Sequence, residues 1–457
     1  MKLVLILFSL LVLPIVAAIE RGPILSAEEP HTAMIANFRT ENVCAGQVKF
    51  RQIGGITWSN ITETTSGTSH AIEMPISSFT EYEYIVLADG DSTGPFSFWS
   101  APAPGALEDF DFCAYGDTRT GLLAHWVIID HIMDCDPMFV TNSGDMIEDG
   151  EDTSDWDNYF AELCEWHNIA QSVPYFYAMG NHDDEAPYFY DALRLPQNPS
   201  GNEAYGSFDW GRIHFTVINS EIDYSITSDQ YEFVSNDLSA AAINPDYDFV
   251  IALVHRPLYS SGYHGREDAL AEAIEPLLVA NAVDLVIQGH DHMYERSHPQ
   301  DGVIYLVTGG GGAPPSPIFY WLSHCAYGYN LYHHLDFHYS AAEHKLSMFM
   351  HDYDDDIVDS LTLIAVPVGI NEGHSDIKEI SVYPNPFNAS CRIVGPRDIG
   401  EIEIFDMSGR QVRRSAIIDG HFNWDGTDEF GAVLPTGVYY VRPVIGTASA
   451  ARIVLIR

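Results

Sequence analysis

The chain has 457 residues, which is too long for one ordinary domain, so we expect two or three domains. It carries 65 acidic residues against 21 basic ones, a formal net charge of −44. Because a nucleic-acid or anionic-membrane surface needs stripes of Lys and Arg, this charge argues against both kinds of partner. It predicts a soluble, self-repelling surface.

The first residues have the pattern of a secretory signal. A short basic start precedes an apolar run from Leu3 to Ala17, with small residues at its end. A buried helix or a membrane anchor is the alternative, but the run is short for a membrane span and the sequence contains no other long apolar segment. We therefore expect export, with residues 1–18 as a signal peptide and no transmembrane segment in the mature protein.

Residues 20–105 alternate short β-rich pieces with turn residues, for example at 32–38, 47–51 and 82–87. Many short strands without a helical period predict an all-β sandwich. The Ala-Pro-Ala-Pro-Gly segment at 101–105 then has the composition of a stiff linker.

From residue 107 to residue 365, strand-like runs alternate with helical stretches, which predicts βαβ units and a layered α/β domain with helices outside. We expect helices at Leu122–Met133, Thr153–Ala170, Ser228–Ala242 and Glu267–Ala280. Residues 331–363 are expected to form a pair of long strands. The glycine run at 309–312 lacks the Lys and Ser or Thr of a nucleotide P-loop and is expected to form a tight loop near the site.

The last stretch, residues 371–457, contains strands separated by Gly-containing turns and predicts a second small β-sandwich. The six cysteines are scattered without Cys-X-X-Cys spacing, so a zinc finger is not expected. In an exported protein Cys135 and Cys164 could pair, although the sequence alone does not fix the connectivity.

Five strand-like runs each stop on Asp, Asn or His. One polar residue after a strand is commonly a turn former or a helix cap, but five such endings are hard to explain as turns. Open α/β sheets place ligands at the carboxyl ends of their strands, and carboxylate, amide and imidazole donors suit a pair of ions such as iron, zinc or manganese. The candidate metal ligands are Asp117, Asp145, Asn181, His255, His290 and His292.

These five endings together resemble the calcineurin-like metallophosphoesterase superfamily, whose site is a two-metal centre. The longer stretches Leu253–His264 and Gly289–Ser297 are similar to the purple acid phosphatase branch, which also carries an N-terminal fibronectin type III-like sandwich. The resemblance implies a four-layer α/β metallophosphoesterase β-sandwich flanked by helices, preceded by an all-β sandwich.

The C-terminal stretch resembles the type A sorting domain of the type nine secretion system, through Tyr383–Asn388, Asp406–Arg410 and Gly437–Tyr440. This resemblance implies a bacterial protein that meets the outer-membrane secretion machinery and is secreted or held at the cell surface. An ordinary structural sandwich is the alternative.

The superfamily resemblance also implies roles for single residues. It places Asp117 and His292 on the first metal, Asn181, His255 and His290 on the second, and Asp145 as the bridge. It implies phosphomonoester hydrolysis by a metal-bound hydroxide. The resemblance places His182 and His264 beside the phosphoryl group, where an imidazole stabilises charge or protonates the leaving oxygen; either one could instead be structural.

Two departures from the purple acid phosphatase pattern stand out. Glu148 occupies the place of the metal-binding Tyr of Gly-Asp-X-X-Tyr, so we predict a colourless enzyme in which Glu148 either binds the metal or caps a turn. Arg119 replaces a Gly, and its donors either reach the substrate phosphate or form a salt bridge. His125, early in the next helix, is a further candidate for the first metal.

The sequence therefore predicts an exported metal-dependent phosphohydrolase that acts on phosphomonoesters. A phosphodiesterase or nucleotide-cleaving enzyme on the same site is the first alternative. A surface adhesion or carbohydrate-binding protein with a relic site is the alternative from another class.

Overall fold

The computed structural model describes residues 19–365, except 184–186, 199, 202 and 319, and residues 380–455, except 384, 386, 388–389, 395–399, 407–409, 417–420 and 445–450. The expected signal peptide, residues 1–18, lies outside the described residues. The chain forms two compact units, Met1–Gly369 and Ile370–Arg457. Among the described residues, no helix is long and apolar enough to cross a membrane.

The first unit begins with two antiparallel sheets, as the sequence predicted. One sheet contains β1 (Ile19–Ser26), β2 (Ala33–Cys44) and β5 (Gly67–Pro75); the other contains β4 (Ser59–Thr62), β3 (Gly46–Gln52), β6 (Glu81–Ala88) and β7 (Asp91–Trp99). In β6 every second side chain is buried, which is the period of a strand with one face on a core.

This sandwich is joined tightly to the rest of the first unit. Leu25 N donates a 2.8 Å hydrogen bond to the Ala170 carbonyl, and the Tyr84 hydroxyl donates one of 2.8 Å to the Gln171 carbonyl. The segment 101–105 is also packed rather than a free linker. Ala101 is fully buried, and the Pro102 carbonyl accepts a hydrogen bond from Gly211 N.

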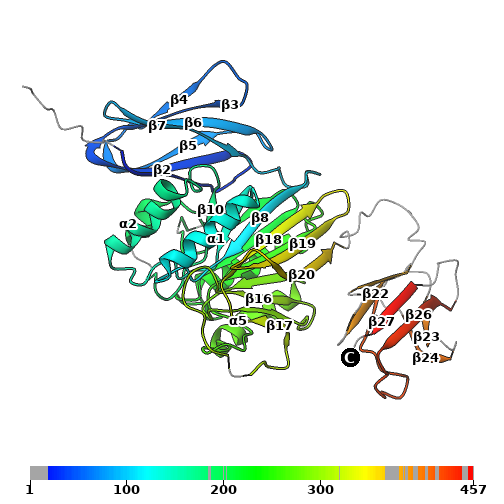
Figure 1. The fold of residues 1–457 in the computed structure, drawn as a ribbon. Coiled ribbons are helices and arrows are strands. Elements are labelled where there is room, and N and C mark those ends of the chain that lie inside the picture. Colours follow the sequence, from blue (N-terminus) through cyan, green and yellow to red (C-terminus); the bar gives the residue numbers. More distant parts are fainter. Residues whose placement is uncertain are drawn as a thin grey trace, which may run out of the picture. The chain divides into compact units, whose positions relative to one another are not determined.

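Two further sheets form the centre of the first unit (Figure 1). One has the order β10-β9-β8-β18-β19-β20, with β8 (Phe110–Tyr115), β9 (Phe139–Asn142), β10 (Tyr175–Tyr177), β18 (His333–Ser340), β19 (Lys345–Asp352) and β20 (Ile357–Ile364). The other has the order β11-β12-β13-β14-β16-β15-β17, with β11 (Gly206–Trp210), β12 (Ile213–Ile218), β13 (Phe249–Val254), β14 (Leu285–Gln288), β15 (Tyr294–Ser297), β16 (Ile304–Thr308) and β17 (Cys325–Tyr329).

Aromatic side chains fill the space between these two sheets. Phe112 stacks on Phe139 and Phe337 of its own sheet, with ring centroids 4.7 and 4.5 Å apart. It meets Phe215 of the other sheet edge-on at 5.6 Å. Such offset and edge-to-face ring pairs are the favourable aromatic geometries, so the two sheets share one dense core.

Helices cover the outer faces of both sheets. They are α1 (Leu122–Asp134), α2 (Thr153–Ala161), continued by the π-helical turn η1 (Glu162–Trp166), α3 (Pro187–Ala192), α4 (Asp229–Ala241) and α5 (Asp268–Ala280). Cores of buried residues join α1, α2 and α3 to the β8 sheet, and α4 and α5 to the β13 sheet. The resulting helix–sheet–sheet–helix order confirms the predicted four-layer fold.

The prediction of a strand pair at residues 331–363 was wrong. Residues 331–363 form three strands, β18, β19 and β20, instead of two. The turns between them contain His344 and Asp355 with positive φ, at 47° and 64°. Asp tolerates this left-handed backbone well, but an Asp-rich segment gave no unambiguous signal of a turn between two strands.

The second unit, from residue 380 on, is all-β, as predicted. One sheet contains β21 (Ser381–Tyr383), β22 (Cys391–Val394) and β25 (His421–Trp424); the other contains β24 (Gln411–Ala416), β23 (Glu401–Asp406), β26 (Gly437–Pro443) and β27 (Ala451–Leu455). Trp424, Ile393 and Val441 are fully buried in its core. Parts of the motifs at 383–388 and 406–410 lie outside the described residues.

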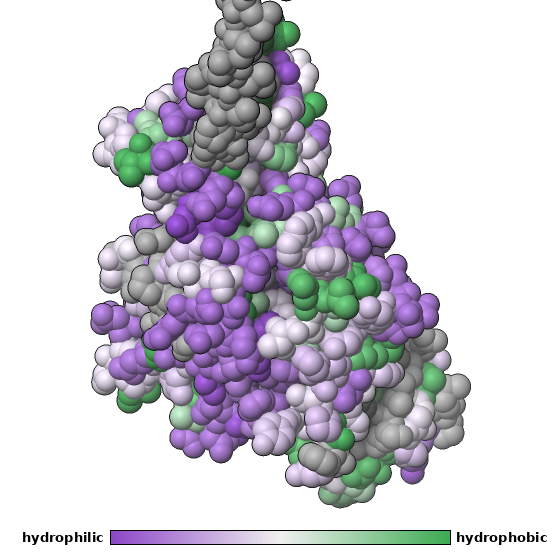
Figure 2. Space-filling view, turned by 60° about the vertical axis from the view of Figure 1, so that its left-hand side comes forward, coloured by the Kyte–Doolittle hydropathy of each residue, from purple (hydrophilic) through white to green (hydrophobic). Residues whose placement is uncertain are grey.

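The face of the molecule in Figure 2 is largely hydrophilic, with scattered hydrophobic patches. This agrees with the solvated surface that the net charge of −44 predicts.

Candidate metal centre

The predicted ligands lie at the carboxyl ends of parallel strands from both central sheets. β8, β9 and β10 run parallel, with Tyr115 opposite Asn142 and Asn142 opposite Tyr177 at their last positions. β13 and β14 run parallel in the other sheet. His255, directly after β13, reaches across with Nδ1 2.8 Å from the carbonyl oxygen of Ser143, directly after β9. The strand ends of both sheets thus meet at one place.

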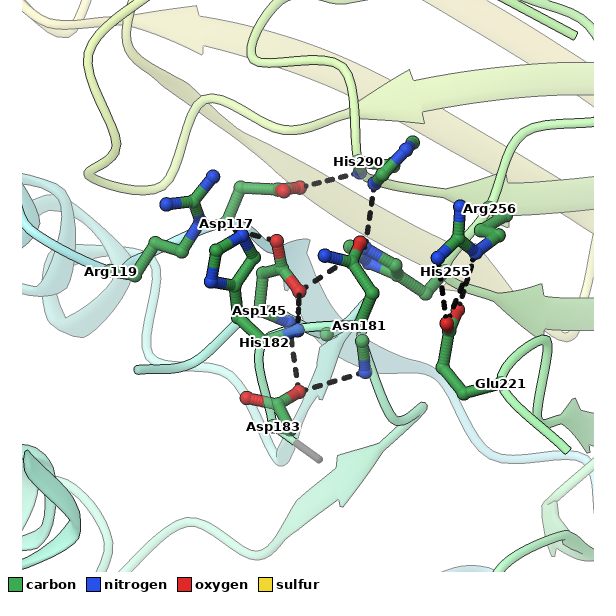
Figure 3. Close-up of polar contacts among 12 residues, drawn as sticks. Asp117, Arg119, Asp145, Asn181, His182, Asp183, Glu221, His255, Arg256 and His290 are labelled. Carbon is green, nitrogen blue, oxygen red and sulfur yellow. Dashed lines mark hydrogen bonds and ion pairs between the residues drawn. The ribbon is translucent and has the colours of Figure 1, made fainter. Parts of the chain in front are cut away.

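Four of the predicted ligands converge on one side of this place (Figure 3). His255 Nε2 lies 3.1 Å from His290 Nδ1, 3.2 Å from Asn181 Oδ1 and 3.3 Å from Asp145 Oδ1. Because His255 Nδ1–H donates to the Ser143 carbonyl, Nε2 presents a lone pair. Several acceptors therefore face one another, an arrangement that a cation stabilises.

The other ligands form a second group around the same carboxylate. His292 Nε2 lies 3.6 Å from Asp117 Oδ1, and Asp117, Asp145 and His292 offer ligand atoms within 4.8 Å of one another. Asp145 also belongs to a group with His255 and His290. Within the described part of the chain, Asp117 Oδ1 and His292 Nε2 are buried without a hydrogen-bond partner. The donor set and these orphaned atoms fit two cations that share Asp145.

The surroundings of the site shift the pKa values of its histidines and aspartates. Burial and the neighbouring His255 lower the pKa of His290, and burial lowers that of His292, so both rings are available as ligands. Burial and the charge of Asp145 raise the pKa of Asp117 well above its usual range. Burial would also raise the pKa of Asp145, but His255 and the backbone N–H of His182 bring it below its ordinary value.

Three of the predicted ligands have strained backbone. Asp117, Asp145 and His290 have positive φ values of 56°, 54° and 71°. Left-handed backbone costs a residue with a side chain about 1–2 kcal/mol. Strain of this kind persists where the surrounding structure holds it, and it concentrates at functional sites.

The two predicted catalytic histidines border the centre. His182 N donates to Asp145 Oδ1 at 3.0 Å, and His182 Nδ1 lies 2.7 Å from the Glu148 carbonyl oxygen, which leaves Nε2 facing elsewhere. The ring of His264 lies 4.1 Å from that of His290, centroid to centroid. Their catalytic roles remain predictions.

Arg119 takes up the salt-bridge position that the sequence left open. Its Nε lies 3.2 Å from Asp145 Oδ2, and Nη1 lies 2.6 Å from Glu148 Oε2. Contact with a substrate phosphate therefore remains a prediction. Glu148 is half-exposed and belongs to neither ligand group of the centre.

Two other sequence-based candidates do not fit. His125 is buried in α1, and its Nδ1 lies 2.7 Å from Glu162 Oε2. Because the ring packs against this buried carboxylate, the prediction that His125 binds the first metal is wrong. Cys135 and Cys164 do not pair: both thiols are free, and Cys164 Sγ lies 3.7 Å from the Pro23 carbonyl.

Sequence reasoning gave no role to two carboxylates that hold the site together. Asp183 accepts hydrogen bonds from the backbone N–H groups of Asp145, Met146 and Gly180, at 2.8–2.9 Å. Asp291 accepts from His264 N at 2.8 Å and from Gly265 N at 3.1 Å. Their position beside the ligands in the sequence was the signal that could have found them.

The expected tight glycine loop lies at the site. Gly311 N donates to the Gly116 carbonyl at 2.9 Å. A Cβ at Gly309 would lie 2.2 Å from the Asp291 carbonyl oxygen and 2.9 Å from Asp117 Oδ2, so a side chain there would collide with the centre.

Comparison with known proteins agrees with this geometry. Residues 114–294 match the family model of the calcineurin-like phosphoesterases, and residues 381–457 match that of the secretion system C-terminal sorting domain. The chain therefore carries a calcineurin-like phosphoesterase domain. Its sorting domain marks the chain for export, to the cell surface or into the medium.

Relatives of this phosphoesterase domain include two proteins of Arabidopsis thaliana. Probable inactive purple acid phosphatase 9 is 27% identical over 45% of this chain and 38% of its own length. Purple acid phosphatase 15 is 32% identical over 34% of this chain and 32% of its own length. The chain thus spans well under two thirds of these relatives.

The fold is also similar to a solved structure. A purple acid phosphatase from yellow lupin (Lupinus luteus) seeds superimposes with a TM-score of 0.67 at 20% identity, over 75% of this chain and 74% of that one. This similarity extends beyond residues 114–294 of the phosphoesterase domain and supports the fold of the first unit.

Proposed function

We propose that the chain is an exported, metal-dependent phosphohydrolase that hydrolyses phosphomonoesters. The observation that carries this proposal is the pair of buried ligand groups that share Asp145: one with His255 and His290, the other with Asp117 and His292. The comparisons add support, since the relatives are purple acid phosphatases by name, although one of them is named as probably inactive.

Two bound cations, iron, zinc or manganese, would neutralise phosphate oxygens and lower the pKa of a water that supplies the nucleophile. The residues of the chain do the rest. Asp145 is fixed between Arg119 Nε and His182 N, so it can bridge without moving. His182 and His264 adjoin the ligand groups through Asp145 and His290, where an imidazole could donate a proton to the leaving oxygen.

We further propose three modules with boundaries near those that the sequence indicates. They are a β-sandwich at 20–105, the phosphoesterase domain at 107–365 and the sorting domain at 371–457. The last would bind the outer-membrane secretion machinery. Since Glu148 pairs with Arg119 and stands where the purple acid phosphatase pattern has Tyr, we keep the expectation of a colourless enzyme.

Hydrolysis of an aryl phosphate monoester and of an aryl diester, with metal analysis of the same samples, tests this function. We expect about two ions bound at the centre and faster turnover of the monoester. Asp145→Ala should lose both activity and the ions of this centre, whereas Asp229→Asn, at an exposed position in α4, should lose neither.

Faster turnover of the diester would favour the phosphodiesterase alternative. No turnover of either ester, together with no metal uptake from iron, zinc or manganese, would overturn the hydrolase and favour a surface-binding protein.

A further inference from the structure

A second group of metal-ligand side chains lies away from the phosphoesterase centre, between α1 and the β8 sheet. Cys113 is buried in β8, directly opposite Asp336 of β18 in the strand register. Cys135 caps the C-terminus of α1, which lies over this sheet (Figure 1). The two sulfurs and an Asp336 oxygen lie within 4.8 Å of one another.

A fourth donor adjoins this group. His334 lies two residues before Asp336 on the same face of β18, and its Nε2 is 3.7 Å from Cys135 Sγ. The ligand atoms of a tetrahedral zinc ion lie roughly 3.3–3.8 Å apart, so this pair already has the required spacing. None of the four residues belongs to the groups around Asp145.

We propose that Cys113, Cys135, Asp336 and His334 bind a structural metal ion, zinc by the chemistry of the donors. Two thiolates, an imidazole and a carboxylate form a mixed sulfur, nitrogen and oxygen set, which selects zinc over hard ions such as magnesium or calcium. The ion would tie the end of α1 to β8 and β18. Since β8 leads directly to Asp117, the ion would also stabilise the position of this predicted ligand of the phosphoesterase centre.

An unmet polar atom supports a cation over a disulfide between the same two thiols. Asp336 Oδ1 is buried and, among the described residues, has no hydrogen-bond partner. A disulfide would consume the thiols and leave this oxygen without a partner, whereas a bound cation would satisfy the carboxylate.

Cobalt is the probe, because thiolate-to-cobalt charge transfer absorbs in the near ultraviolet and the ligands of the phosphoesterase centre contain no sulfur. The reduced, metal-free full chain is titrated with Co²⁺ under anaerobic conditions. We expect a thiolate band whose final intensity corresponds to one thiolate-bound ion per chain in the wild type and which persists in Asp145→Ala. It should vanish in Cys135→Ser and remain in Cys44→Ser, a matched change at another half-buried thiol.

His334→Gln should weaken cobalt binding, measured by this band, by about tenfold or more. Circular dichroism of the metal-free variants checks that each one folds. No band in the wild type, or a band of unchanged intensity in Cys135→Ser, would overturn the proposal. The first of these results, with a Cys113–Cys135 disulfide in peptide mapping, would assign the two thiols to a disulfide instead.

Discussion

Asp291 supports the candidate centre through hydrogen bonds to the backbone of a neighbouring loop. It stands between His290 and His292 in the sequence, but its carboxylate binds the backbone N–H groups of His264 and Gly265. It also accepts a 2.5 Å hydrogen bond from the hydroxyl of Ser260. Asp291 therefore positions the loop that carries His264.

Asp291→Asn should lower kcat for an aryl phosphate by about 10- to 100-fold, the usual cost of disturbing a residue that supports a metal site. The NH₂ group of Asn cannot accept the hydrogen bonds that the backbone N–H groups of His264 and Gly265 now donate to the Asp291 carboxylate. Metal content should stay near that of the wild type, and His264→Ala should add little in the Asp291→Asn background. Asp301→Asn, in an exposed turn, is the control. Equal losses of metal and activity would instead mean that Asp291 acts through His290.

At this scale the sequence identified candidate metal ligands that the structure brings together, because each one lies just after a short apolar strand; their role as ligands stays a prediction. Asp117, Asp145 and His255 could be identified in this way. Asp183 and Asp291 could not be assigned, since their partners are backbone N–H groups whose positions depend on how the loops fold. The same limit applies to His125, whose partner Glu162 lies on another helix.

Among the elements, β11, β12 and α4 are joined by one imidazole. His214 of β12 lies with Nδ1 2.7 Å from Asp209 of β11 and with Nε2 3.0 Å from Asp237 of α4. Burial would lower the pKa of His214, but hydrogen bonds and charges from the two carboxylates outweigh it and raise the pKa to about 9. The protonated ring therefore stabilises the fold.

This raised pKa predicts a stability that depends on pH. Unfolded His titrates near pH 6.5, so the contribution of His214 should be complete below that pH and be lost as the pH rises through about 9. Urea unfolding should show the largest gap between wild type and His214→Gln near pH 6, on the order of 3 kcal/mol, with a smaller gap at pH 9. His31→Gln, in the N-terminal sandwich, is the control. A gap that is constant from pH 6 to pH 9 would contradict the prediction.

The elements themselves were predicted unevenly. β8 and α5 have nearly the expected bounds, since an apolar run or a helical period marks them clearly. The helix expected at Thr153–Ala170 ends earlier, as α2 followed by the π-helical turn η1, which the sequence pattern does not distinguish from an α-helix. β11 and β12 are separated by a two-residue turn containing Gly211 and were not recognised.

At the scale of the whole molecule, the β-rich stretches at the two ends of the sequence differ in whether they share a hydrophobic core with the phosphoesterase domain. Ile24 of β1 is buried in the same core as Tyr115 and Ile128, and Arg21 lies 4.5 Å over the Phe160 ring. Residues 370–457, in contrast, form a compact unit of their own. Composition and alternating patterns predicted both β-rich ends. They did not predict which of the two shares a hydrophobic core with the phosphoesterase domain.

Deleting residues 370–457 should leave the thermal unfolding of the first unit and its aryl phosphatase kinetics unchanged, while export is lost. Deleting residues 19–105 should lower the melting temperature of the remaining chain, since it uncovers Phe160 and removes Ile24 from a shared core. Differential scanning calorimetry of both truncations, beside the full chain, measures this. Equal melting temperatures in the two truncations would contradict the shared core, and unchanged kinetics without residues 19–105 would exclude a role of the sandwich in shaping the site.

The left-handed backbone at Asp117, Asp145 and His290 also limits how this centre can be transferred. A designer who grafts the six predicted ligand side chains onto the strand ends of another protein would copy the side chains without the backbone that orients them. The graft would have to include the three strained turns, together with the carboxylates and glycines that hold them. The transferable unit is therefore the set of loops, with the side chains as one part of it.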